Sequence, residues 1–264
     1  MVNKLEKIND RIHALRIPYK DIFTTVYFVK TEDGMLLFDT ASYDSDVDDY
    51  VIPALRQLGV GEDDLKYVFI SHNHTDHAGG LERLLSFYPK VCVVSRSDAL
   101  AERFGSDTVL SPQEGETLLK DLSVVFITGH TADSAALYDG KTKMLICGDC
   151  LQLYGIFGSG KWGANISFFA EYEEAISKLR ILDIDAILTA HDYHPCGRMF
   201  FGKEAISAAL DACLAPFARI QQLIDFDPSA DDETICARYH SQGDLPTLAP
   251  RVVKRYRETK SIAP

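Results

Sequence analysis

Several features are scarce in this 264-residue chain, and each scarcity excludes a class of protein. No apolar run approaches the roughly 18 residues that a membrane-spanning helix needs, so no membrane partner is expected. The N-terminus lacks the apolar core of a signal peptide, and the sequence therefore predicts a cytoplasmic protein. Lys and Arg number 27 against 39 Asp and Glu, and the resulting net charge of -12 argues against a nucleic-acid partner.

Cysteine is also sparse, because six residues in a chain of this length are too few for a disulfide framework. Cys147 and Cys150 do match the C-x-x-C pattern of redox centres and structural zinc sites. No second pair of this kind completes a four-ligand zinc site. We interpret the match as a coincidence that flanks Asp149.

Strand and helix patterns alternate along both halves of the chain. Apolar, β-branched and aromatic residues predict strands at 22–30, 35–39, 65–71, 91–94, 123–128, 135–138, 144–147 and 186–190. Helical periodicity predicts helices at 47–58, 79–88, 97–104, 171–182, 203–224, 231–240 and 249–260. A kink or interruption is expected at Pro216. The alternation indicates an α/β fold in which helices cover mixed sheets.

One short segment carries an unusual density of potential metal ligands. His72, His74, Asp76 and His77 lie within six residues at the C-terminal end of an apolar strand, where open α/β sheets place their ligands. Imidazoles and a carboxylate packed this closely lose water and share charge, which is unfavourable unless a cation binds them. The segment therefore predicts a metal site.

Three further candidate ligands, His130, Asp149 and His191, each follow a predicted strand. Together with the first four they make seven ligands, which are too many for one tetrahedral ion but suit two bridged ions. The sequence thus predicts two divalent metal ions per chain. Zinc is favoured by the histidine-rich set, and iron and manganese also accept His and Asp ligands.

This ligand set resembles the metallo-β-lactamase superfamily in order and spacing. The motif His72-x-His74-x-Asp76-His77 is followed by the other three ligands at intervals of 53, 19 and 42 residues. The resemblance implies a four-layer αββα sandwich with two mixed β-sheets. We expect residues 1–199 to form this catalytic domain, with a C-terminal helical extension at 200–264 packed on the same domain.

The resemblance also implies a role for each ligand. Asp149 would bridge the two ions. The implied ligands of the first ion are His72, His74 and His130, and those of the second are Asp76, His77 and His191. A hydroxide that bridges such ions attacks a carbonyl carbon, and Asp76 is the expected catalytic residue because it both coordinates an ion and orients the nucleophile.

The residues at two ligand positions narrow the range of activities expected within the superfamily. β-Lactamases usually carry Cys or Ser where this chain has Asp149, and flavodiiron oxidoreductases use Glu in place of His74. The chain is more similar to the glyoxalase II group of thioesterases and to lactonases, so we expect a metal-dependent hydrolase of a thioester, ester or lactone. Two alternatives stay open: an oxidoreductase similar to the persulfide dioxygenases with a single iron, and a phosphodiesterase of the same superfamily.

The segment after Asp149 gathers large apolar side chains around several glycines, which predicts a pocket for a small-molecule substrate. The candidate substrate-contacting residues are Tyr154, Phe157, Trp162, Tyr193 and His194. Core packing is the alternative for the aromatic segment, and orienting His191 is the alternative for Tyr193 and His194. The C-terminal helices are expected either to cover the mouth of the site or to form a homodimer contact.

Overall fold

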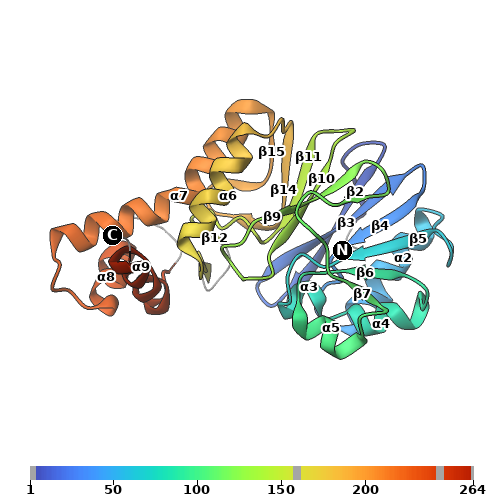
Figure 1. Cartoon of the computed structure of the whole chain (residues 1–264), viewed down its shortest axis with the longest axis horizontal. Coiled ribbons are helices and arrows are strands. Elements are labelled where there is room, and N and C mark those ends of the chain that lie inside the picture. Colours follow the sequence, from blue (N-terminus) through green and yellow to red (C-terminus); the bar gives the residue numbers. More distant parts are fainter. Residues whose placement is uncertain (1–3, 157–161, 242–246, 263–264) are drawn as a thin grey trace.

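The computed structural model describes residues 4–156, 162–241 and 247–262 and contains two β-sheets (Figure 1). In these residues the first sheet has seven strands in the order β1 to β7. They are β1 (Glu6–Lys7), β2 (Ile12–Tyr19), β3 (Ile22–Thr31), β4 (Gly34–Phe38), β5 (Leu65–Phe69), β6 (Cys92–Val94) and β7 (Val109–Leu110). Strands β1 to β4 pair antiparallel and β4 to β7 pair parallel, so the sheet is mixed as predicted.

The second sheet has the strand order β13-β12-β14-β11-β10-β9-β8, with β15 also paired to β14. Its strands are β8 (Thr117–Leu118), β9 (Leu122–Phe126), β10 (Ala135–Asp139), β11 (Met144–Gly148), β12 (Gly155–Ile156), β13 (Trp162–Gly163), β14 (Ala186–Tyr193) and β15 (Gly197–Phe201). β11 and β14 are parallel and the other pairs are antiparallel, so this sheet is mixed too. Because β15 ends at Phe201, the sheet extends two residues beyond the expected boundary at 199.

Helices cover the outer faces of the two sheets (Figure 1). Those on the first sheet are α1 (Asp44–Asp46), the π-helix Val47–Val51, α2 (Ile52–Gln57), α3 (Thr75–Ala78), α4 (Leu81–Phe87) and α5 (Asp98–Phe104). The outer face of the second sheet is covered by α6 (Phe169–Ile181) and α7 (Gly202–Phe226). α8 (Asp232–Ser241) and α9 (Pro250–Ile262) pack on α7 and α6 and extend away from the sheet (Figure 1). None of the helices in the described residues is long and apolar enough to cross a membrane.

Three apolar clusters hold these layers together. Between the sheets, Phe38 and Phe69 of the first sheet share a cluster with Leu137 of the second. A second cluster joins the outer face of the first sheet to its helices, and a third joins the second sheet to α6, α7, α8 and α9. This is the four-layer αββα arrangement that the sequence predicted.

Two details differ from the expectation. α7 is continuous across Pro216, so the predicted interruption there is wrong. Proline removes only one backbone hydrogen bond, and Pro216 is buried in the cluster beside Phe217 and Ile220, whose packing maintains the helix. The strand predicted to end at Ala190 continues to Tyr193, which pairs with both Ile156 and Gly197.

Candidate metal centre

The seven predicted ligands come from four places in the fold that lie at the same edge of the two sheets. His72 and His74 lie in the loop after β5. Asp76 and His77 lie in α3, which follows this loop directly. His130 follows β9 and Asp149 follows β11, as expected. His191 lies within β14 rather than after it, because the strand is longer than predicted.

The donor atoms of these residues form two groups, and within each group they all lie within 4.8 Å of one another. One group consists of His72, His74, His130 and Asp149, and the other consists of Asp76, His77 and His191. Zinc–nitrogen and zinc–oxygen bonds of about 2.0–2.2 Å bring ligand atoms this close together. The structure therefore brings all seven residues together at one place, in two groups that could each hold a metal ion.

Asp149 lies between the two groups. Its Oδ2 is 3.3 Å from Nε2 of His130 and 3.5 Å from Nε2 of His191. The same oxygen is 3.9 Å from Nε2 of His77. One carboxylate oxygen thus faces imidazoles of both groups, which is the position that a bridging ligand requires.

Hydrogen bonds behind the imidazoles fix which ring nitrogen faces the centre. His130 Nδ1 donates to the carbonyl oxygen of Asn165 at 2.6 Å, and His191 Nδ1 donates to that of Phe23 at 2.6 Å. His77 Nδ1 donates to Asp39 Oδ2 at 2.7 Å. Each of these rings is therefore left with Nε2 directed inward, as metal-ligating histidines require.

His77 provides a direct test of whether the residues fit a metal ion. Its Nε2 is a buried nitrogen that makes no hydrogen bond, although carboxylate oxygens of Asp76 and Asp149 lie 3.4 Å and 3.9 Å away. Folded proteins seldom leave a buried nitrogen in this state unless a ligand is bound there. In the other group, His74 Nδ1 lies 2.9 Å from Nε2 of both His72 and His130. Three nitrogen atoms that converge in this way match the ligand chemistry of a divalent cation.

The pKa values of the buried carboxylates and imidazoles are shifted in different directions. Burial acts to raise the pKa of Asp149, but the imidazoles around it outweigh burial and hold this pKa well below its usual value. Burial lowers the pKa of His72 well below its usual range. For His191 burial also acts to lower the pKa, yet hydrogen bonds to Asp149 and Asp76 raise it to about 9.

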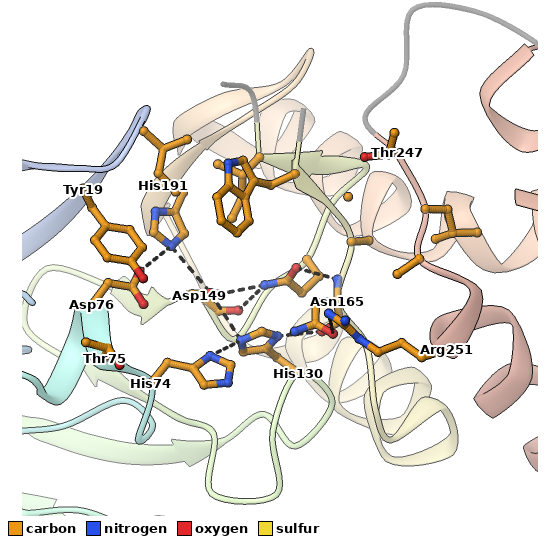
Figure 2. A pocket seen from close by; sticks show the side chains of 18 residues that line it. Tyr19, His74, Thr75, Asp76, His130, Asp149, Asn165, His191, Thr247 and Arg251 are labelled. Atoms are coloured by element: carbon orange, nitrogen blue, oxygen red, sulfur yellow. Dashed lines mark hydrogen bonds and ion pairs between the residues drawn. The ribbon is translucent and has the colours of Figure 1, made fainter. Parts of the chain in front are cut away.

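The centre opens into a cavity of about 420 Å³. Figure 2 shows five of the ligands around it: His74, Asp76, His130, Asp149 and His191. Apolar walls are supplied by Ile22, Ile156, Trp162, Leu248 and Ala249. The last two residues precede α9, so the C-terminal region contributes to the cavity wall.

The predicted substrate-contacting residues occupy different positions. Trp162 lines the cavity, and its Nε1 donates to Asp21 Oδ1 at 3.1 Å. Tyr193 is buried, and its hydroxyl lies 3.4 Å from Asp149 Oδ1. Tyr154 and His194 are half-buried and are not among the lining residues, and Phe157 lies outside the described residues.

Several residues of the cavity have no signal in the sequence. Gln152 lines it beside Asp149. Asn165 lines it beside His130, and Tyr19 lines it beside Asp76 and His191 (Figure 2). Arg251 of α9 reaches toward Asn165, with 3.4 Å between its guanidinium and the Asn165 Oδ1. These residues come from segments far apart in the chain, and no local spacing relates them.

Gly163 determines how closely the C-terminal wall can approach. A Cβ atom on Gly163 would lie 1.5 Å from the carbonyl oxygen of Thr247. Gly163→Ala is therefore expected to push Thr247 and the start of α9 outward, and to reduce amide protection in α9 by about 10- to 100-fold, the equivalent of about 1–3 kcal/mol of overpacking. Hydrogen exchange measures this protection.

Gly140→Ala is the matched control, because its Cβ would lie 3.5 Å from the nearest atom outside its neighbours. Its amide exchange should equal that of the wild type. Unchanged protection of α9 in Gly163→Ala would show that the wall does not rest on Gly163.

A two-sheet αββα protein with two His/Asp groups at one edge of its sheets is the class that this fold and site define. The family model described as the metallo-beta-lactamase superfamily matches residues 19–191. The chain belongs to that superfamily.

Its curated relatives are distant. The uncharacterized protein YobT of Bacillus subtilis (strain 168) is 29% identical in an alignment 188 residues long, which covers 59% of this chain and 76% of YobT. A hydroxyacylglutathione hydrolase of Synechococcus sp. (strain JA-3-3Ab) is 37% identical over 114 residues, which are 42% of this chain and 43% of that protein. The chain thus matches under half the length of that hydrolase, although the expected resemblance to the glyoxalase II group is confirmed.

Solved structures confirm the fold. A metallo-beta-lactamase family protein from Thermus thermophilus superposes with a TM-score of 0.70 at 16% identity, over 97% of this chain and 95% of that one. A mutant of the flavo di-iron protein from Thermotoga maritima gives a TM-score of 0.64 at 19% identity, over 83% of this chain and 63% of that one. At these identities the likeness is one of fold.

Proposed function

We propose that this chain is a binuclear metal-dependent hydrolase that acts on a thioester, ester or lactone bond of a small molecule. The observation that carries the proposal is the position of the two ligand groups, which meet at one cavity with Asp149 between them. Relatives named hydroxyacylglutathione hydrolase support cleavage of an acyl bond.

Two divalent ions held by these ligands would supply hydroxide at neutral pH and polarise a carbonyl oxygen. Asp76 lines the cavity, so its carboxylate can accept a hydrogen bond from an attacking water and orient it. The Thr24 hydroxyl donates to Asp76 Oδ2 at 3.1 Å and holds this carboxylate in place. Asp76 therefore acts both as a ligand and as the residue that aims the nucleophile.

The walls of the cavity favour an acyl group over a phosphodiester. Its volume is within the range of small-molecule pockets, about 300–1,000 Å³. Ile22, Ile156 and Leu248 offer apolar contacts, and Trp162 offers an aromatic face. Among the described lining residues Arg251 is the one Lys or Arg, which leaves little positive charge from the chain itself for a phosphate backbone.

A hydrolysis panel tests the proposal. Protein reconstituted separately with zinc, manganese and iron is assayed against thioesters, esters, lactones, β-lactams and phosphodiesters, with oxygen consumption measured on persulfides. We expect cleavage of a thioester, ester or lactone that chelation abolishes and metal restores. Oxygen consumption with one iron per chain, or cleavage of phosphodiesters alone, would overturn the proposal in favour of a dioxygenase or a phosphodiesterase.

A further inference from the structure

Gln152 is a buried amide in the wall of the metal centre, with 1% of its surface exposed. Its Nε2 donates to the backbone oxygen of Asp149 at 2.9 Å and to Asp149 Oδ1 at 2.8 Å. Its Oε1 accepts a hydrogen bond from the backbone N–H of Asn165 at 3.0 Å. Each end of the amide therefore faces a partner of the correct kind, which fixes its orientation.

The two carboxylate oxygens of Asp149 have different partners. Oδ1 accepts hydrogen bonds from Gln152 and, at 3.4 Å, from the Tyr193 hydroxyl. Oδ2 is left to face His130 and His191. A carboxylate without such a partner rotates about its terminal torsion, which is broad for Asp, and offers either oxygen.

The other end of Gln152 leads to a second ligand. Gln152 accepts a hydrogen bond from the backbone N–H of Asn165. The backbone carbonyl of Asn165 in turn accepts a hydrogen bond from His130 Nδ1 at 2.6 Å. Gln152 is thus connected to Asp149 directly and to His130 through one residue's backbone. Both are members of the same group of potential ligands.

We propose that Gln152 is a positioning residue that directs Asp149 Oδ2 between the two metal sites and keeps Asp149 in register with His130. The inference rests on the proposed two-ion centre. A glutamate at position 152 would place a second negative charge against Asp149. A methionine there would have no hydrogen to donate and would leave Asp149 Oδ1, a buried oxygen, with a weaker set of hydrogen bonds.

Two variants of similar shape test the proposal. Gln152→Met removes the donor, and Gln152→Glu replaces it with an acceptor. Both are expected to bind zinc about 10- to 100-fold more weakly than the wild type, since losing the partner of a metal ligand typically costs that much affinity. Cobalt-substituted protein should show an altered visible absorption spectrum in both variants. Neither measurement depends on a substrate.

Gln221→Met and Gln221→Glu in α7 are the matched controls. Gln221 Nε2 donates to Asp225 Oδ1 at 2.7 Å and its Oε1 accepts from the Tyr256 hydroxyl at 2.8 Å, away from the metal centre, so zinc affinity and the cobalt spectrum should match those of the wild type. For each variant the rise in melting temperature on adding zinc separates metal binding from folding. A wild-type rise and spectrum in Gln152→Met and Gln152→Glu would overturn the proposal, whereas a wild-type chain that binds no ion pair would overturn the proposed function itself.

Discussion

Replacing Asp149 by alanine is expected to lower kcat/KM for the proposed hydrolysis by about 10³-fold, equivalent to losing about 4 kcal/mol of transition-state stabilisation. Asp149 Oδ2 is the carboxylate oxygen that faces His77, His130 and His191 together. Without it, the two groups share no ligand and the imidazoles lose the negative charge between them. Zinc content should fall below two ions per chain.

Asp183→Ala is the control for loss of a carboxylate. Asp183 is exposed and pairs with Lys143 at 2.6 Å, away from the cavity. Such a surface ion pair contributes about 0–1 kcal/mol, so activity and zinc content should stay at wild-type values. Full activity in Asp149→Ala would mean that the bridging position is not needed.

Removal of the metal is expected to abolish hydrolysis and to lower the stability of the fold. An ion present at about 1,000 times its dissociation constant stabilises the folded chain by about 4 kcal/mol, and chelation removes this contribution. Thermal unfolding with chelator, and after addition of zinc, measures the difference. Equal melting temperatures in both states, with activity unchanged by the chelator, would contradict a metal-dependent centre.

Without the metal ions, imidazoles of the centre are expected to bind protons. Despite burial, Asp149 and Asp76 raise the pKa of His191 to about 9, and Asp76 and Asp39 raise that of His77 well above its usual value. In the metal-free chain His191 therefore carries a proton near neutral pH. An incoming ion must displace bound protons, so zinc binding near pH 7 should release protons and weaken as pH falls.

The sign of the stability effect follows from the same pKa values. A pKa that is higher in the folded than in the unfolded chain stabilises the fold below the unfolded value, and the contribution disappears as pH rises through the folded value. For His191 this contribution is complete below about pH 6.5 and is lost as pH rises through about 9. Metal-free protein should therefore lose stability over this interval. Calorimetric titrations with zinc in buffers of different ionisation enthalpy measure the number of protons released. If zinc binding releases no protons, the raised pKa of His191 in the metal-free chain is contradicted.

The ligands could be predicted from sequence because their chemistry is dense and local. His72, His74, Asp76 and His77 lie in one short loop and helix, where such crowding has few explanations other than a cation. The partners of these ligands had no such signal. Gln152 is a single amide in an apolar segment, and only the folded chain shows that it contacts Asp149.

Strands made of apolar residues could be predicted from the sequence. Strands that form because a neighbouring strand pairs with them were harder to predict. β2 contains Arg16 and Pro18, which weaken its strand pattern, but β3 pairs with it along its whole length. The cavity wall at Thr247 and Leu248 was likewise hidden, because it depends on the close approach of Gly163 to a segment more than 80 residues later in the chain. Contacts of this kind are made by tertiary structure, and local propensity carries no record of them.

Anomalous diffraction from crystals of the zinc-loaded protein tests the central claim most directly. Two peaks at the zinc edge are expected in each chain, with Asp149 between them. The first should lie among His72, His74 and His130, and the second among Asp76, His77 and His191. A map without peaks at these positions under saturating zinc, or with peaks only elsewhere on the chain, would contradict the account.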